Sequence, residues 1–200
     1  MSRDPRSGDA ARTRILDAAA SLFAERGFDG VSVGEIAERA QVSPANVFYH
    51  FTNKQTVYDR VVERSRDLLG AAFRAIEGTG SPRDRIEAVV SDYTRLVFEH
   101  PEAMRLLVEH IRRSAKSSRD VLLQAAGRVI RGLAAVIAEG VESGDFSPVD
   151  PAMAAEILFG MMNVRAASMV LESPGGVDET DPEAVAAFVS ALFFEGVCSC

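Results

Sequence analysis

The stretch that decides the fold is residues 32–51, SVGEIAERAQVSPANVFYHF. Its apolar residues recur at the helical period in two short segments, about 33–40 and 44–51. Two short helices joined by a turn of three or four residues form a helix-turn-helix, whose second helix enters the major groove of DNA. The spacing therefore predicts a helix-turn-helix in the first quarter of the chain.

Capping residues mark the start of both predicted helices. Ser32 followed by Glu35 three residues later is the pattern of a capping box, in which the two residues satisfy free backbone amides. Ser43 is a typical N-cap, and Pro44 takes the first helical position, where no amide hydrogen is needed. Both helix starts are thus specified by local sequence.

The second of these helices has two chemically different faces when it is drawn at about 100° per residue. One arc is apolar and is expected to face the rest of the bundle; it holds Val47, Phe48 and Phe51. The opposite arc is small and polar, and it carries Ala45, Asn46, Tyr49 and His50. Such side chains let a backbone approach base edges and form hydrogen bonds with bases and phosphates. Lys54 follows at the start of the next helix, where it can meet a phosphate.

The rest of the chain also follows the helical period, without sustained alternation at period two. Further helices are expected at about 9–26, 54–76, 83–99, 102–115, 118–143, 151–172 and 182–197. Glycine, proline and serine mark the breaks between them. The sequence predicts an all-α protein, with an N-terminal three-helix unit, a connecting helix and a larger helical body.

Composition is compatible with a DNA-binding globular protein. The 200 residues are 47% hydrophobic and 26% charged, which is enough apolar material for a sizeable core. The net charge of −7 lies in the body, because residues 1–56 contain equal numbers of basic and acidic side chains. With no apolar run long enough to cross a membrane and no signal peptide, the expected location is the cytoplasm.

Residues 13–58, TRILDAAASLFAERGFDGVSVGEIAERAQVSPANVFYHFTNKQTVY, resemble the TetR family of transcriptional regulators. The resemblance implies a protein of about nine helices: a DNA-binding domain at 9–56 and an effector-binding and dimerisation domain at 57–200. It implies a homodimer that represses transcription at an approximately palindromic operator and releases DNA when a small molecule binds the body. No enzymatic activity and no cofactor are expected.

The predicted DNA-binding residues fall into two groups. At the entry of the helix at about 33–40, the positions that match the family are Val33 and Gly34. Around the recognition helix, the positions that match the family's usual DNA contacts, together with the first helical residue Pro44, are Ser43, Ala45, Asn46, Tyr49, His50 and Lys54. Two positions depart from the pattern. Many relatives have a long polar residue where Gly34 stands, so that contact is missing here. The turn usually has glycine where Gln41 stands, and a left-handed conformation would cost glutamine on the order of 1–2 kcal/mol.

The helical body contains candidates for an effector pocket and a dimer interface. A soft apolar lining with a histidine and an arginine is formed by Phe98, Met104, Leu107, His110, Ile111, Met161, Met162, Arg165 and Met169. Arg165 suggests an apolar anion as ligand, although ordinary core packing explains each residue as well. The last helix has apolar residues on more than one face, which suggests a dimer interface at Ala184, Ala187, Phe188, Leu192 and Phe193.

Three other patterns point weakly to different chemistry. Gly30–Gly34 matches the G-x-S-x-G elbow of serine hydrolases, but no strand precedes it and Ser32 has a capping role. His100 and His110 lack the spacing of metal ligands on a helix. Cys198 and Cys200 have no basic neighbour that would make them reactive. A helical carrier or enzyme that does not bind DNA remains the alternative function.

Overall fold

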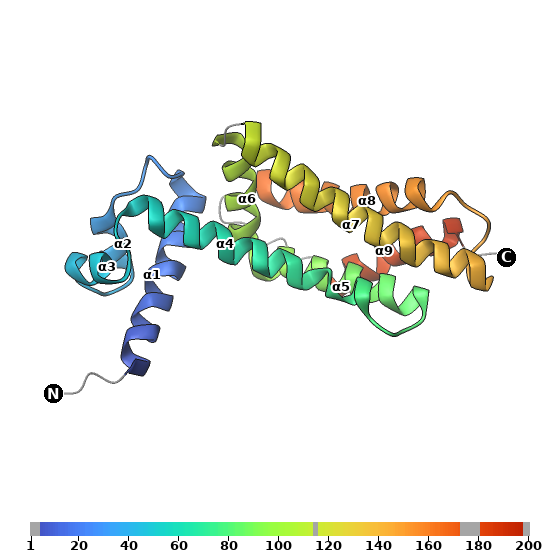
Figure 1. Ribbon diagram of the computed structural model, residues 1–200, viewed down its shortest axis with the longest axis horizontal. Helices are drawn as coiled ribbons and strands as arrows, with labels where there is room; N and C mark the ends of the chain where they lie inside the picture. The colour runs from blue at the N-terminus through green and yellow to red at the C-terminus, as the bar shows by residue number, and fades with distance from the viewer. Residues whose placement is uncertain (1–4, 114–115, 173–180, 198–200) are drawn as a thin grey trace. The chain divides into compact units, whose positions relative to one another are not determined.

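The computed structural model describes residues 5–113, 116–172 and 181–197, and within these ranges every regular element is helical (Figure 1). The N-terminal elements are α1 (Pro5–Arg26), α2 (Val33–Arg39), α3 (Pro44–His50) and α4 (Lys54–Ala72), followed by the 3₁₀ turn η1 (Arg74–Glu77). The remaining helices are α5 (Pro82–Glu99), α6 (Pro101–Arg113), α7 (Lys116–Ser143), α8 (Pro151–Glu172) and α9 (Pro182–Val197). The predicted all-α fold is confirmed.

The helix bounds agree with the sequence prediction except near a few ends. α1 begins at Pro5, four residues earlier than expected. The helix predicted to run from Lys54 to residue 76 ends instead at Ala72, and η1 follows it. A 3₁₀ turn tightens the end of a helix and leaves carbonyl groups that need donors. Arg85 of α5 supplies them, since its guanidinium group donates to the carbonyl of Ile76.

The chain folds into two compact units. Unit 1 contains the residues up to Asp67 together with Glu102–Arg113, so it includes α1, α2, α3, most of α4 and α6. Unit 2 contains Leu68–Pro101 and the residues from Ser114 onward. The grouping differs from the sequence-based boundary at residue 56 in two ways: unit 1 includes α4 as far as Asp67, and it includes α6.

Each unit has its own apolar core. In unit 1, α1, α2, α3 and α4 meet around fully buried residues that include Ile15, Phe23, Ile36, Val47 and Val57. In unit 2, α5 packs on α9 and α7 packs on α8, and the core includes Ile86, Val89, Leu133, Ile137 and Leu158. Among the described residues, no helix is long and apolar enough to cross a membrane.

Candidate nucleic-acid interface

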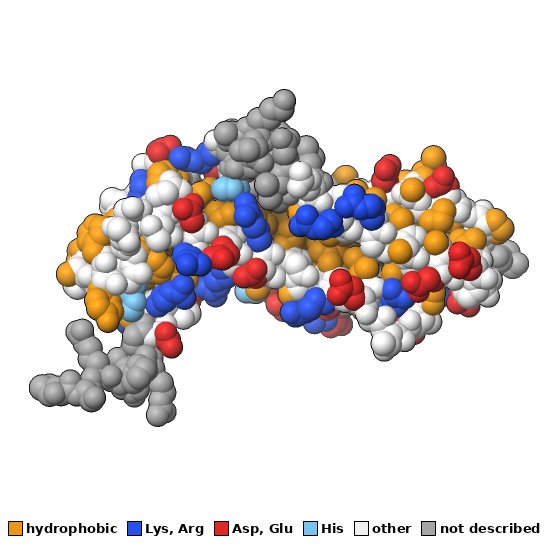
Figure 2. Space-filling model, viewed as in Figure 1, with side chains coloured by type: hydrophobic (Ala, Val, Ile, Leu, Met, Phe, Trp, Pro, Cys, Tyr) orange, Lys and Arg blue, Asp and Glu red, His pale blue; other side chains and the backbone are white. Residues whose placement is uncertain are grey.

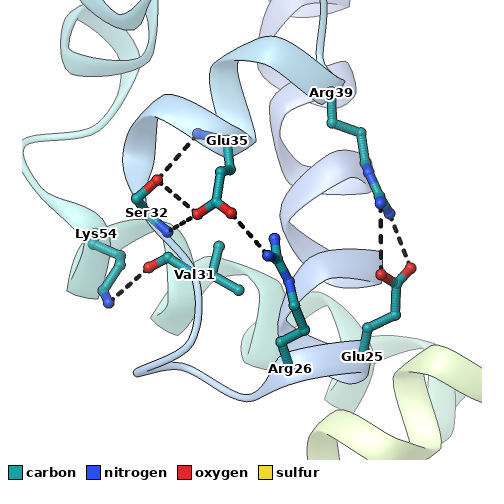
Figure 3. A network of polar contacts seen from close by, with 7 residues as sticks. All are labelled: Glu25, Arg26, Val31, Ser32, Glu35, Arg39 and Lys54. Atoms are coloured by element: carbon teal, nitrogen blue, oxygen red, sulfur yellow. Dashed lines mark hydrogen bonds and ion pairs between the residues drawn. The ribbon is translucent and has the colours of Figure 1, made fainter.

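The start of α2 is fixed by a complete capping box, as predicted (Figure 3). The backbone amide of Glu35 donates to Ser32 Oγ at 3.2 Å, and the Glu35 carboxylate accepts from the Ser32 amide at 2.8 Å and from the hydroxyl at 2.7 Å. Arg26 of α1 donates to the same carboxylate at 2.8 Å. These hydrogen bonds from Ser32, and then that from Arg26, lower the pKa of Glu35 from 4.5 to about 2.

The turn between α2 and α3 contains a strained residue. Gln41 has a φ of 55°, which confirms that a non-glycine residue adopts the left-handed conformation expected here. The amide of Val42 donates to the carbonyl of Ala37 at 3.0 Å and so closes the end of α2. Backbone hydrogen bonds thus fix the turn between the two helices, at the cost of a strained backbone conformation at Gln41.

α3 is short, capped and anchored by few contacts. The amide of Asn46 donates to Ser43 Oγ at 3.2 Å, and Pro44 is the first helical residue, as predicted. Val47 and the C-cap residue Phe51 are buried, which confirms their inward orientation. Asn46 and His50 are half-buried on the flanks of this buried pair.

The outer surface of α3 is wider and more aromatic than the sequence predicted. Tyr49 is 75% exposed, and Phe48, which was expected to face the bundle, is 53% exposed. The prediction for Phe48 is therefore wrong: this residue lies about 100° round the helix from the buried Val47, outside the arc that is covered. We define the reading face as Ala45, Asn46, Phe48 and Tyr49; Asn46 is half-buried and the others are exposed. Figure 2 shows hydrophobic side chains gathered over the α2–α3 end of unit 1.

The other predicted contact residues vary in exposure. Ser43, Pro44 and Gly34 are exposed, while Val33 and His50 are half-buried. A side chain at Gly34 would meet only Ser32 Oγ, 3.8 Å from its Cβ, so the missing long residue is not excluded by space.

Lys54 has structural partners that the sequence did not indicate. Its ammonium group donates to the carbonyls of Phe28 and Val31, both at 2.9 Å, and lies 4.2 Å from the centroid of the Phe28 ring. Figure 3 shows the link to Val31. Lys54 therefore holds the turn between α1 and α2, and its contact with a phosphate stays a prediction.

Most cations described in unit 1 are paired within the protein. Arg26 pairs with Glu35 at 2.8 Å, Arg39 with Glu25 at 2.9 Å and Arg113 with Asp29 at 2.6 Å. Arg12 and Arg14, in the N-terminal half of α1, differ. The guanidinium carbon of Arg12 lies 5.7 Å from the Phe51 ring centroid, and Arg14 Nε donates to the Ala40 carbonyl at 3.3 Å. Both are exposed at the C-terminal ends of α2 and α3.

The remaining predicted residues are placed as follows. In α6 of unit 1, Met104 and Leu107 are buried and His110 is half-buried; in unit 2, Phe98 and Met161 are half-buried and Met162 is buried. The side chains of Ile111, Arg165 and Met169 lie outside the described residues. A shallow hollow of about 440 Å³ between α5 and α9 contains none of the predicted pocket residues. The pocket therefore stays a prediction.

On α9, Ala184, Ala187, Phe188 and Leu192 are exposed, as a dimer interface requires, and Phe188 is 64% exposed. Phe193 is only 5% exposed, so its assignment to that surface is corrected: it belongs to the core of unit 2. One turn separates Phe188 from Leu192, whereas Phe193 lies about 100° further round the helix.

The competing patterns gain no support. Ser32 lies at a helix start within a capping box, and the described residues contain no strand that could precede a hydrolase elbow. The described residues also contain no cluster of three or more potential metal ligands. Cys198 and Cys200 lie outside the described residues.

Comparisons with known proteins agree with this geometry. The family model for bacterial regulatory proteins of the tetR family matches residues 15–61, and a model for a tetracycline repressor-like C-terminal domain matches residues 79–167. The regulator RutR of Escherichia coli K12 is 32% identical over 150 residues, which cover 73% of this chain and 69% of RutR. The repressor KstR2 of Rhodococcus jostii is 29% identical, with 74% of each chain covered.

Among solved structures, FadR of Bacillus subtilis in complex with stearoyl-CoA has a TM-score of 0.68 and 20% identity, covering 92% of this chain and 98% of FadR. That similarity supports the fold. The family models and the match to RutR, together with the capped helix-turn-helix, lead to one conclusion: the chain belongs to the TetR family and is a DNA-binding transcriptional regulator.

Proposed function

We propose that this regulator is a homodimeric repressor, which binds an approximately palindromic operator with α3 and releases it when a small amphipathic molecule binds unit 2. The observation that carries the proposal is the exposed reading face, presented by a helix whose start and preceding turn are both fixed. Repression then follows from occupancy of the operator.

Contacts with base edges and with the DNA backbone fall to different residues. On the reading face, the Asn46 amide and Tyr49 hydroxyl can hydrogen-bond to bases or phosphates, and Ala45 lets the helix approach closely. α3 itself carries no lysine or arginine. Arg12 and Arg14 are exposed and contact the C-terminal ends of α3 and α2. Neither arginine has a carboxylate partner among the described residues. They are suited to neutralise phosphates beside the groove.

A second copy of the chain accounts for the exposed apolar surface of unit 2. Large apolar side chains are exposed on α8 at Met153, Ile157 and Val164 and on α9 at Phe188 and Leu192. Two helices from each copy would form a four-helix interface with two-fold symmetry. Two recognition helices related in this way bind half-sites about 34–36 Å apart, which requires an approximately palindromic operator.

For the effector, unit 2 offers an apolar interior that contains a hydrogen-bonded polar pair. The hydroxyl of Tyr93 donates to Asn163 Oδ1 at 3.0 Å, and the predicted pocket residue Met162 directly precedes Asn163 in the chain. Burial raises the pKa of Tyr93 to about 12, so its hydroxyl stays a neutral donor at physiological pH. Stearoyl-CoA, the ligand in the FadR structure, combines apolar and polar parts as such a site would demand. Release of DNA requires that the effector bind the DNA-free form more tightly.

The direct test is an electrophoretic mobility shift with DNA from upstream of the chain's own coding region. Tyr49→Ala should weaken binding at least tenfold while leaving the helical circular dichroism spectrum intact, because Tyr49 is exposed and supports no core contact. A matched control is Glu142→Gln, an exposed residue of α7 that should leave binding unchanged. Equal binding by wild type and Tyr49→Ala would contradict the proposal. Binding without sequence preference would favour the alternative of a helical carrier.

A further inference from the structure

The feature that the proposed function leaves unused is the exposed ring of Phe48. A phenylalanine that is 53% exposed has a large apolar area in water and has no group that could hydrogen-bond to a base or a phosphate. It lies in the middle of α3, between the buried Val47 and the exposed Tyr49. Whatever covers this ring must therefore offer an apolar surface.

The position of Phe48 on α3 tells which part of the operator it faces. Val47 is 1% exposed and defines the inward direction. At about 100° per residue, Ala45 and Tyr49 lie within about 20° of the outward direction, and Asn46 and Phe48 lie about 80° to either side of it. The reading face thus has an amide on one flank and an aromatic ring on the other.

The chemistry of the major groove supplies one apolar partner for that ring. Base pairs there present hydrogen-bond donors and acceptors and a single apolar group, the 5-methyl of thymine. Resting on the proposed function, we propose that Phe48 determines operator specificity by contacting the 5-methyl group of one thymine in each half-site. Asn46 reads polar base edges on the opposite flank of the same helix.

A selection experiment with the full-length chain tests this contact from a pool of random duplex DNA, so the operator sequence need not be known. The pool is selected by wild type and by Phe48→Ala, which should fold normally because the ring is exposed. Wild type should enrich thymine at one position of each half-site, and Phe48→Ala should accept all four bases at that position. At the remaining positions of the half-site, both proteins should prefer the same bases.

Deletion of the methyl group then tests the contact itself. Replacing the selected thymine by deoxyuridine in one half-site should weaken wild-type binding about fourfold, which corresponds to one buried methyl group. The same replacement should leave Phe48→Ala binding unchanged, and Phe48→Leu, which keeps an apolar side chain, should retain part of the effect. Thymines outside the contacted base pair serve as the matched DNA control.

The outcomes separate this inference from the proposed function. If wild type enriches a sequence but the methyl deletion affects wild type and Phe48→Ala equally, the thymine contact is overturned and the repressor assignment stands. If wild type enriches no sequence at all, the proposed function fails and this inference fails with it.

Discussion

The α3 end of unit 1 and the α8–α9 surface of unit 2 both expose large apolar side chains, but they are built differently. The reading face lies on a seven-residue helix, with an N-cap, a strained turn before it and an ion-paired helix beside it. The α8–α9 surface lies on two long helices and exposes five large apolar side chains, at Met153, Ile157, Val164, Phe188 and Leu192.

This difference indicates different partners. A narrow ridge of mixed amide, phenol and aromatic groups suits a groove lined with polar base edges. A broad face of long helices suits a second copy that presents the same face. Exposure of apolar side chains therefore does not by itself identify a partner; the length and chemistry of the element that carries them support the two partners proposed.

The largest expected effect separates surface from core on α9. Phe193→Ala should lower the free energy of unfolding by about 3–5 kcal/mol, because it removes a buried ring. Phe188→Ala on the same helix should instead weaken dimerisation and leave the stability of the protomer nearly unchanged. Urea denaturation at several protein concentrations distinguishes them, since only the dimer contribution depends on concentration. Equal losses from both substitutions would mean that α9 has no free apolar face.

The next effect concerns the charge beside the reading face. Arg12→Gln with Arg14→Gln should reduce the slope of log K against log salt by about 0.9 for each arginine. As the salt concentration rises from about 50 to 200 mM, the affinity of wild type should fall by a factor about ten times larger than that of the double variant. Fluorescence anisotropy with a selected duplex measures this. Arg60→Gln, whose guanidinium pairs with Glu63, is the control, and an unchanged slope in the double variant would exclude both phosphate contacts.

A smaller effect is expected in the turn between α2 and α3. Gln41→Gly should raise the free energy of unfolding by about 1 kcal/mol, because glycine adopts a positive φ without steric strain. Gln41→Ala should have the stability of wild type within about 0.5 kcal/mol, since alanine has the same strain as glutamine. Urea denaturation of the three proteins measures the difference. If the glycine variant is no more stable than the alanine variant, the turn is not strained.

The smallest effect is a pH dependence of the α2 cap. Because the pKa of Glu35 is lowered from 4.5 to about 2 in the folded protein, ionised Glu35 stabilises the fold above pH 4.5. That contribution is lost as the pH falls from 4.5 towards 2. The stability difference between wild type and Glu35→Gln should therefore be constant from about pH 7 to 5 and shrink below it.

Denaturation at about pH 7, 4 and 3 measures this trend. The same comparison is then made in a Ser32→Ala background, which lacks the hydroxyl group that hydrogen-bonds with Glu35. In that background the difference between Glu35 and Gln should be reduced at neutral pH. A difference that grows as the pH falls would contradict the role of the carboxylate.

Local sequence was sufficient for some of these features and not for others. Ser32, Glu35, Ser43 and Pro44 act on neighbours within a few residues, so their capping roles could be predicted. The left-handed Gln41 followed from the resemblance to a family that has glycine there. The orientations of Phe48 and Phe193 could not be obtained in this way, because which side of an apolar helix is buried depends on the helices that pack against it.

Long-range contacts set the other limit. Lys54 binds carbonyls more than twenty residues away, and Arg14 binds the end of α2, so neither partner could be deduced from spacing. Arg12 and Arg14 are visible in the sequence as two of several cations in the first quarter of the chain, but only the ion pairs of the other arginines distinguish them.

The most direct test of the central claim is selection of duplex DNA by the full-length wild-type chain, followed by measurement of its affinity for the selected sequence. We expect an inverted repeat whose half-sites lie about one turn of DNA apart, or a multiple of it, bound with an affinity that Tyr49→Ala lowers at least tenfold. Selection that enriches no sequence, or an affinity that the substitution leaves unchanged, would contradict the claim that α3 reads DNA.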